Sequence, residues 1–292
     1  MSKKLENFIN IAKEKFAVVS YSGGMDSTCL LLYLLSEGYM VNAISFDYGQ
    51  SHSLELKRAK KITKYLQGMG MAVSHQVINL RDAFSDSQSS LVRLEHAPEG
   101  HYEDESMKAT VVENRNVIFS AITFGKALAW ARLNLDSYGP GFPEDEARRR
   151  SKVVISLGVH AGDHAIYPDC TEESVNMAKE LYRISNWDSD LVEYDTPFVN
   201  YSKAEVLNTG ISSARKMGMS KRQINTILKN TVSCYNADEK GVSCGKCGTC
   251  TERLEAFWNI GMDDPAPYVD PDMGILVGKP KNWNYTPVED QG

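Results

Sequence analysis

The sequence lacks the long apolar segment that a membrane span or a secretory signal requires. Its longest uninterrupted apolar run, Cys29 to Leu35, is far shorter than the roughly 20 residues that cross a bilayer. The first five residues include Lys3 and Lys4 and start no apolar h-region. We therefore expect a chain without a membrane span that works in the cytoplasm.

The sequence also has little proline and no basic excess. Ten Pro and 21 Gly in 292 residues are too few for a collagen-like or low-complexity chain. The 32 Lys and Arg are outnumbered by 38 Asp and Glu, whereas nucleic-acid coat proteins normally carry a strong basic excess. No direct contact with nucleic acid is expected. A small anionic substrate stays compatible with this charge, because a few focused positive side chains are enough to bind it.

Two common nucleotide-binding signatures are absent. Neither the Walker pattern G-x-x-x-x-G-K-[ST] nor the dinucleotide pattern G-x-G-x-x-G occurs anywhere in the chain. This argues against β–γ phosphate cleavage of the Walker type and against dinucleotide binding.

Short apolar, β-branched stretches alternate with helix-like spacing in the first part of the chain. This alternation is typical of a doubly wound α/β fold with a mainly parallel sheet. The expected strands and helices are 16–21, 28–36, 41–46, 54–66 and 71–78. A helix at about 116–133 and a strand at 153–157 are expected to follow.

Polar insertions and helix-capping sequences suggest how the rest is organised. Residues 85–106 lack periodicity and are expected to form a long loop or lid, and 136–150 is a second polar insertion. Thr171 can cap a helix, and capping boxes open two more helices at Ser202 and Ser220. Three units are predicted: an α/β nucleotide-binding domain (1–200), a helical metal-binding part (201–264) and a C-terminal tail (265–292), extended on the surface or partly disordered.

A glycine-containing turn follows the first strand. Ser22-Gly23-Gly24-Met25-Asp26-Ser27 lies between the expected strand and helix, where backbone N–H groups and the helix N-terminus favour an anion. The hydroxyls of Ser22, Ser27 and Thr28 can donate to phosphate oxygens. A carboxylate at Asp26 suits a Mg²⁺ ion that accompanies phosphates. The alternative interpretation is a glycine turn that caps the helix for structural reasons only.

Four of the six cysteines are clustered near the C-terminal end. Cys234, Cys244, Cys247 and Cys250 follow a C-x9-C-x2-C-x2-C pattern, whereas Cys29 and Cys170 stand alone. Four thiolates at this spacing predict a closed structural zinc site in a reducing compartment. An iron–sulfur cluster is the alternative metal group.

The turn at 22–27 resembles the pyrophosphatase-loop (PP-loop) motif of N-type ATP pyrophosphatases, which implies an adenine nucleotide alpha hydrolase-like fold. Further motifs occur in order along residues 16–260: 21–28, Phe46-Asp47-Tyr48-Gly49-Gln50-Ser51-His52, Asn114-Arg115-Asn116, Gly158-Val159-His160-Ala161-Gly162-Asp163, Tyr167-Pro168-Asp169-Cys170, Thr196-Pro197-Phe198 with Lys203 and Glu205, and Thr231 to Cys250. As a set they resemble the 7-cyano-7-deazaguanine synthase family of queuosine and archaeosine precursor biosynthesis.

This resemblance implies a reaction and its residues. ATP adenylates 7-carboxy-7-deazaguanine, ammonia displaces AMP to give an amide, and a second adenylation lets the amide dehydrate to a nitrile. The resemblance places ATP and its Mg²⁺ at Tyr21, Ser22, Gly23, Gly24, Asp26, Ser27, Thr28 and Asp47. It assigns catalysis to Asp26, Arg115 and Lys203, and deazapurine binding to Asp163, Tyr167 and Asp169.

Several alternatives stay open at this stage. Lys203 can also be a solvated helix residue, and Asp169 can merely cap the helix after Pro168. Thr171 stands where the family usually has arginine, and this departure keeps open a relative that stops at the amide or transfers the acyl group to another amine, such as one on a protein partner. A PP-loop tRNA thiolase and a non-enzymatic zinc-knuckle module are the other candidate functions. The expected partners are otherwise small molecules, with a homodimer as a further expectation.

Overall fold

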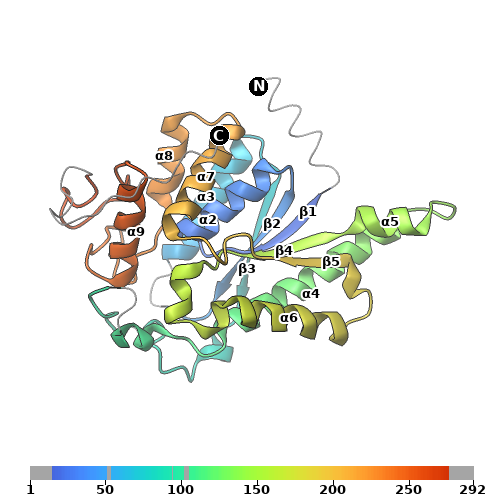
Figure 1. The fold of residues 1–292 in the computed structure, drawn as a ribbon, viewed down its shortest axis with the longest axis horizontal. Helices are drawn as coiled ribbons and strands as arrows, with labels where there is room; N and C mark the ends of the chain where they lie inside the picture. Colours follow the sequence, from blue (N-terminus) through green and yellow to red (C-terminus); the bar gives the residue numbers. More distant parts are fainter. Residues whose placement is uncertain (1–14, 51–53, 94, 102–104, 276–292) are drawn as a thin grey trace.

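A parallel β-sheet forms the centre of the molecule. The computed structural model describes residues 15–50, 54–93, 95–101 and 105–275. Its five strands lie in the order β3-β2-β1-β4-β5, and every neighbouring pair is parallel (Figure 1). The strands are β1 Phe16–Ser20, β2 Met40–Asp47, β3 Val73–Asn79, β4 Val153–Leu157 and β5 Val192–Asp195. The doubly wound α/β fold predicted from the alternation is confirmed.

Helices connect the strands and extend the chain beyond β5. The α-helices are α2 Met25–Ser36, α3 Leu54–Gly68, α4 Arg115–Asp136, α5 Glu144–Ser151, α6 Glu172–Ser185, α7 Lys203–Lys216, α8 Lys221–Asn230 and α9 Gly248–Asn259. Short 3-10 helices are η1 Asp82–Phe84, η2 Glu105–Thr110, η3 Ala161–Ala165, η4 Pro168–Cys170 and η5 Ser189–Leu191. The helix predicted at 28–36 begins three residues earlier, at Met25, directly after the glycine turn.

Each face of the sheet has its own hydrophobic cluster. Successive side chains of a strand point to opposite faces, so Ala17 and Val19 of β1 join one cluster and Val18 joins the other. Helices α2, α3, α7 and α8 cover the first face, and α4 and α6 cover the second (Figure 1). Because both faces are covered, the central strands β1 and β4 are buried over most of their length, whereas the edge strands β3 and β5 also carry exposed polar residues.

The capping sequences start the helices that they predict. The hydroxyls of Ser202 and Ser220 accept hydrogen bonds from the N3 amides of α7 and α8, and both capping boxes are complete. Thr171 caps α6 through the amide of Ser174. Residues of α7 and α8 share the cluster of α2 and β1, and the division of the chain into three units stays a prediction.

The second polar insertion contains a helix that the sequence pattern did not reveal. Within 136–150, α5 has three acidic residues in its first turn and three arginines in its last turn. This distribution of charge interacts favourably with the helix dipole. Arg148 pairs with Asp190 at 2.7 Å and with Asp188 at 3.3 Å. Charges at the helix ends and ion pairs stabilise α5. The helix therefore does not depend on an apolar face, and its sequence shows little apolar periodicity.

The first polar insertion docks against the cysteine segment. Apart from η2, the described parts of 85–106 form turns and irregular chain, and residues 94 and 102–104 lie outside the description. Ala97 exchanges two hydrogen bonds of 2.9 Å with the side chain of Asn236, and the amide of Gly100 donates to the carbonyl of Lys246 at 3.0 Å. These contacts attach the insertion to the segment that carries the cysteines, and its role as a lid stays a prediction.

The tail begins as a packed segment. Residues 265–275 form turns, and Tyr268 is buried, with its hydroxyl donating to Asp264 at 2.6 Å. The rest of the predicted tail, 276–292, lies outside the described residues, as do Ser51 and His52 of the second-strand motif.

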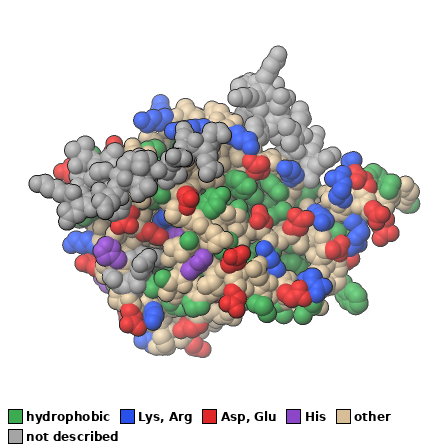
Figure 2. All heavy atoms as spheres, viewed as in Figure 1, with side chains coloured by type: hydrophobic (Ala, Val, Ile, Leu, Met, Phe, Trp, Pro, Cys, Tyr) green, Lys and Arg blue, Asp and Glu red, His purple; other side chains and the backbone are tan. Residues whose placement is uncertain are grey.

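The described residues include no helix with the length and apolar character of a membrane span. On the face shown in Figure 2, acidic and basic side chains of these residues are interspersed. The described side chains on that face therefore form no continuous basic surface of the kind that follows a nucleic-acid backbone.

Candidate active site

The glycine turn and the start of α2 lie at the carboxyl ends of β1 and β4, where the strand order reverses. In open α/β sheets the ligand crevice lies at this position. Gly23 has a φ of 84°, which L side chains rarely adopt, and a Cβ there would lie 2.9 Å from the amide nitrogen of Ala59. Gly24 is the N-cap of α2, and no side chain caps this helix. The first-turn amides of α2 therefore suit an anion.

A second glycine brings the substrate-side motif against the same turn. A Cβ at Gly158, which follows β4, would lie 3.1 Å from the amide nitrogen and from the Cα of Ser27. Any larger residue would force the backbone of the turn to shift, so glycine favours this close approach. Both motifs thus open onto one edge of the sheet, as the sequence predicts.

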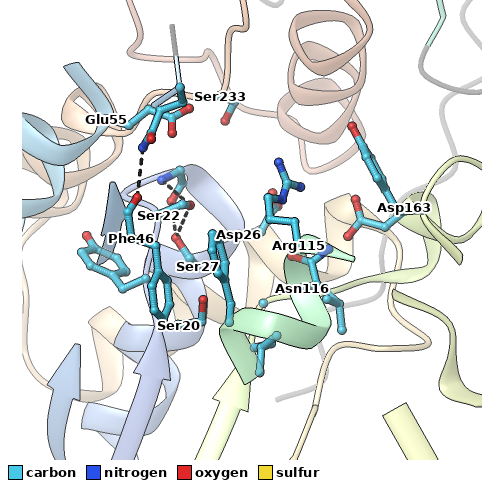
Figure 3. A pocket seen from close by; sticks show the side chains of 18 of the residues that line it. Ser20, Ser22, Asp26, Ser27, Phe46, Glu55, Arg115, Asn116, Asp163 and Ser233 are labelled. Atoms are coloured by element: carbon cyan, nitrogen blue, oxygen red, sulfur yellow. Dashed lines mark hydrogen bonds between the residues drawn. The ribbon is translucent and has the colours of Figure 1, made fainter. Parts of the chain in front are cut away.

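A cavity of about 220 Å³ occupies this edge (Figure 3). Nine of the predicted site residues line it: Tyr21, Ser22, Gly24, Asp26, Ser27, Arg115, Asp163, Tyr167 and Lys203. Four do not: Gly23, Thr28, Asp47 and Asp169. The remaining wall is largely aromatic and aliphatic, including Phe46, Tyr48, Leu56, Leu91 and Phe119.

Lys203 and Asp26 form the charged centre of the pocket. The Nζ atom of Lys203 lies 3.2 Å from Oδ2 of Asp26 and 2.7 Å from Oε2 of Glu252. Lys203 is only 7% exposed, so the alternative of a solvated helix residue is wrong. The other carboxylate oxygen of Asp26, Oδ1, is buried without a hydrogen-bond partner. An orphaned buried carboxylate oxygen beside a phosphate-type turn is the donor that a Mg²⁺ ion would use.

The charges of this pair shift both pKa values in the expected directions. Burial is the largest single effect and would raise the pKa of Asp26, but Lys203 and His160 together outweigh it and lower that pKa. Burial alone would lower the pKa of Lys203, but Asp26 and Glu252 outweigh it and raise that pKa. Asp26 is therefore an anion and Lys203 a cation at neutral pH.

Arg115 supplies a second cation to the pocket lining. It is the first residue of α4, after Asn114, whose left-handed φ of 57° turns the chain into the helix. Its guanidinium lies 5.8 Å from the ring centroid of Tyr48 and 5.6 Å from that of Tyr167. Two aromatic faces hold the charge in the pocket by cation–π attraction.

Three predicted residues act behind the pocket wall. Asp169 accepts hydrogen bonds from the backbone amide and the side chain of Asn116, at 2.9 and 3.2 Å. Asp169 therefore accepts a hydrogen bond from a free backbone amide in the first turn of α4. The helix that follows Pro168 is capped by Thr171, not by Asp169. Asp47 pairs with Arg81 at 2.9 Å, and the hydroxyl of the fully buried Thr28 lies 3.3 Å from that of Tyr21.

Sequence reasoning missed several residues of this site. Glu55, Ser233 and Tyr235 line the cavity, and Glu252 contacts Lys203. Tyr235 is hydrogen bonded to Tyr167 at 3.0 Å. Ser233 and Tyr235 flank Cys234, so their position beside the cysteine motif was a usable signal, whereas nothing in the local sequence marked Glu55 or Glu252.

Glu55 makes the stability of the folded protein depend on pH. Burial raises its pKa from 4.5 to about 7, although Arg115 opposes this. Between these values the folded protein keeps a proton that the unfolded chain has released, so stability present below pH 4.5 is lost as the pH rises towards 7.

We expect Glu55→Gln to raise the free energy of unfolding at pH 8 by about 1–2 kcal/mol, since each pKa unit is worth ~1.4 kcal/mol and pocket water reduces the full value. At pH 4.5 the variant and the parent should be equally stable. Urea unfolding at both pH values is the measurement. An equal gain at both would contradict the assignment of this pKa.

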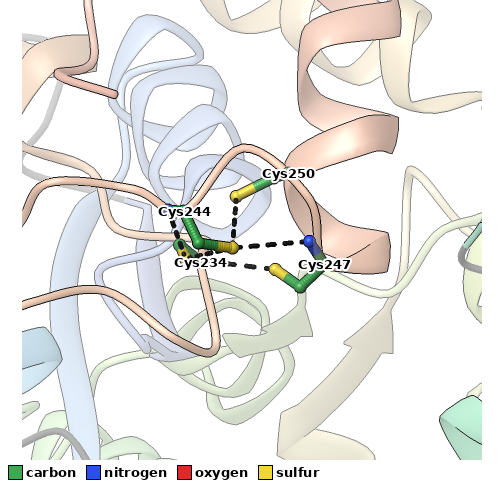
Figure 4. Close-up of side chains that lie close together, drawn as sticks. All are labelled: Cys234, Cys244, Cys247 and Cys250. Atoms are coloured by element: carbon green, nitrogen blue, oxygen red, sulfur yellow. Dashed lines mark hydrogen bonds between the residues drawn. The ribbon is translucent and has the colours of Figure 1, made fainter. Parts of the chain in front are cut away.

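The four clustered cysteines converge on one point (Figure 4). Their sulfur atoms all lie within 4.8 Å of one another, with 3.5 Å between Cys234 and Cys244 and 4.0 Å between Cys244 and Cys250. The amides of Lys246 and Cys247 donate to the Cys244 sulfur at 3.4 Å. All six cysteines of the chain are unpaired. Four converging sulfurs with amide donors fit a bound metal ion.

A buried arginine, Arg253, links the cysteine segment to the chain that contacts the glycine turn. Arg253 of α9 makes two hydrogen bonds to Asp264, at 2.6 and 2.9 Å, and both side chains are almost fully buried. Arg253 also donates to Thr231 at 2.7 Å, and the next residue, Val232, hydrogen bonds to the carbonyl of Gly23. The cysteine segment and the glycine turn therefore support each other.

Comparison with known proteins agrees with the geometry. The model of the family described as queuosine biosynthesis protein QueC matches residues 16–136 and 142–261. A 7-cyano-7-deazaguanine synthase of Marinomonas sp. is 41% identical over 253 residues, which cover 86% of this chain and 97% of that protein. The corresponding synthases of Pseudoalteromonas translucida and Methanoregula boonei are 40% and 38% identical over the same length, covering 97% and 98% of those proteins. The chain belongs to the family of the queuosine biosynthesis protein QueC.

Proposed function

We propose that this chain is an ATP-dependent 7-cyano-7-deazaguanine synthase, which converts 7-carboxy-7-deazaguanine and ammonia to the nitrile. The observation that carries the proposal is a PP-loop turn that opens onto a pocket with Asp26 and Lys203 at its centre. The names of the relatives support the substrate class.

The chemistry requires activation of a poor electrophile. A carboxylate oxygen of the substrate attacks the α-phosphate of ATP, and pyrophosphate leaves. Ammonia then attacks the acyl adenylate, AMP leaves and a proton is released, which gives the amide. A second ATP adenylates the amide oxygen, which releases pyrophosphate and one proton, and loss of AMP and the second N–H proton forms the nitrile. Each adenylate must be shielded from water, and the largely aromatic and aliphatic wall suits this purpose.

We assign the phosphates of ATP to the turn. The amides after Gly24 and the hydroxyls of Ser22 and Ser27 face the cavity, and Gly23 shapes the turn from behind. Mg²⁺ would be held by Oδ1 of Asp26 and would supply charge neutralisation at the phosphates. Lys203 and Arg115 neutralise charge on the leaving pyrophosphate and on the reacting phosphoryl group. Tyr21, Thr28 and Asp47 support the turn and the end of β2.

We assign the deazapurine to the side of the pocket lined by Asp163 and Tyr167. A carboxylate can accept from the donor-rich amidine edge of a guanine-like ring. Asp169 contributes by fixing the start of α4, and hence Arg115, because its carboxylate is bonded to Asn116.

This division of roles separates two aspartates. We expect Asp163→Asn to raise the KM for the deazapurine about ten- to a hundredfold, since a charged hydrogen bond to the ring is lost, and to leave the KM for ATP nearly unchanged. Asp169→Asn should instead lower stability by about 1–2 kcal/mol with a smaller change in that KM. Steady-state kinetics and thermal unfolding of both variants are the measurements. Equal KM effects in the two variants would contradict the assignment.

We assign zinc to the four cysteines. Thiolate ligands in a closed set of four, with no position left for substrate, are typical of a structural zinc site. The unpaired cysteines also support the proposal of a reducing compartment, such as the cytoplasm. A homodimer stays a prediction.

In the test, the protein is incubated with ATP, Mg²⁺, ammonium and 7-carboxy-7-deazaguanine, and the mass of the product is measured by mass spectrometry. The nitrile together with AMP and pyrophosphate is expected. ADP and phosphate as the only nucleotide products would overturn the PP-loop assignment. A product that stays at the amide, or an added mass on a protein amine, would overturn the nitrile and favour the related adenylating enzymes.

A further inference from the structure

Glu252 lies where three parts of the molecule meet. It belongs to α9, two residues after Cys250, and its Oε2 atom lies 2.7 Å from the ammonium of Lys203 at the start of α7. Its Oε1 atom lies against Gly162, where a Cβ would collide with it. The carboxylate is thus held between the cysteine segment, the charged centre and the loop that bears Asp163.

Asp26, Glu252 and Asp163 all act on the charge of Lys203, and the first two have different tasks. Asp26 lies 3.2 Å from the Nζ atom of Lys203 and has its other oxygen buried without a hydrogen-bond partner, whereas Glu252 lies closer, at 2.7 Å, and does not line the cavity. His160 is also within 3.3 Å of Nζ. A metal ion on Asp26 would weaken its hold on Lys203, and Glu252 would then be the carboxylate that keeps the lysine in place.

The cysteine segment fixes the position of Glu252. Cys247 is the N-cap of α9, Cys250 lies in the first turn of this helix, and both are buried. Arg253, the next residue after Glu252, is anchored by Asp264. The helix therefore presents Glu252 from a rigid support, and Thr249 of the same turn lines the cavity.

We propose that Glu252 is a positioning residue: it holds the ammonium of Lys203 at the pocket wall, facing the phosphates, and so leaves Asp26 to the metal ion. This inference rests on the proposed function, because it assumes that Mg²⁺ and ATP occupy the turn. Without the Glu252 charge, nothing balances the pull of Asp26 on Lys203, so the ammonium stays on Asp26 and competes with the metal.

The experiment compares Glu252→Gln with Glu252→Asp. Glutamine keeps the size and removes the charge, so we expect the Kd for Mg²⁺-ATP, measured by calorimetry without deazapurine, to rise about ten- to a hundredfold. The free Mg²⁺ needed for half-maximal turnover should rise, and kcat should fall by roughly tenfold or more. The KM for the deazapurine should stay within about twofold, since Asp163 is unchanged. Aspartate keeps the charge and should recover most of the loss.

A matched control breaks a lysine–glutamate pair of the same length at the surface. Lys216 and Glu37 are also 2.7 Å apart but exposed, so Glu37→Gln should leave every parameter unchanged. Parent-like Mg²⁺-ATP binding in Glu252→Gln would overturn the positioning role. So would equal losses in Glu252→Asp and Glu252→Gln, or losses that only follow metal content and thermal stability. A parent enzyme that binds Mg²⁺-ATP but makes no nitrile would instead overturn the proposed reaction and leave this role standing.

Discussion

Replacing Asp26 with asparagine is expected to lower kcat by roughly a thousandfold or more and to leave the fold intact. The Oδ1 atom of Asp26 is the buried, unpartnered oxygen at the phosphate turn. Asparagine removes the negative charge on which a Mg²⁺ ion and the ordered phosphates would depend, and losing one preorganised electrostatic contact in an active site costs about 10²–10³ in rate. Loss of a metal ligand should reach the upper end of that range.

The fold should tolerate this change because Lys203 keeps another partner. Removing one member of a buried ion pair usually costs about 3–5 kcal/mol, since the other charge is left alone. Here Glu252 stays 2.7 Å from the same ammonium, so we expect a loss of only about 1–2 kcal/mol.

The measurements are single-turnover release of AMP and urea unfolding. Asp190→Asn is a suitable control, because this exposed carboxylate pairs with Arg148, which keeps Asp188 as a second partner. Turnover by Asp26→Asn above about a tenth of the parent rate would show that the turn works without this carboxylate.

The contiguous parts of the site could be predicted from the sequence. The strand, the glycine turn and the helix at 16–36 follow one another in the sequence. Four cysteines at close spacing likewise predict a metal site from the sequence alone. Local chain geometry controls both features, so the residues alone were sufficient. The capping boxes at Ser202 and Ser220 were predictable for the same reason.

The pairings between distant segments could not be predicted. Glu252 meets Lys203 only because α9 packs beside α7, and no local pattern distinguishes it from a solvated acidic residue. Asp169 looked like a substrate ligand or a cap for the next helix, but its carboxylate satisfies the start of α4. Such roles depend on tertiary contacts, which neither spacing nor propensity encodes.

Removing the metal from the cysteine site is expected to cost the protein several kilocalories per mole. Cys234, Cys247 and Cys250 are almost fully buried and pack with Leu254 and Tyr268 in one cluster. Binding energies of structural zinc sites are folding energies, of order 10 kcal/mol in small peptides, whereas a whole domain is stable by only about 5–15 kcal/mol. Loss of the ion should therefore loosen α9 and the segments that its Arg253 anchors.

The variant for this prediction is Cys247→Ser, because this thiol is fully buried at the N-cap of α9. Elemental analysis should find about one zinc per chain in the parent and much less in the variant. The thermal midpoint should fall by about 10 °C or more, since 1 kcal/mol corresponds to roughly 2–4 °C at this size. Cys29→Ala removes a buried cysteine outside the cluster and should keep the zinc.

The same experiment decides between zinc and an iron–sulfur cluster. Zinc has no redox chemistry, so protein purified without oxygen should be colourless, whereas a visible absorption band from iron and sulfide would refute the zinc assignment. If the metal is structural, ATP binding should decline in Cys247→Ser only as the fold is lost, and a stabilising solute should restore it. Loss of AMP release in a variant that stays fully folded would instead place the metal in the chemistry, which a closed set of four thiolates does not allow.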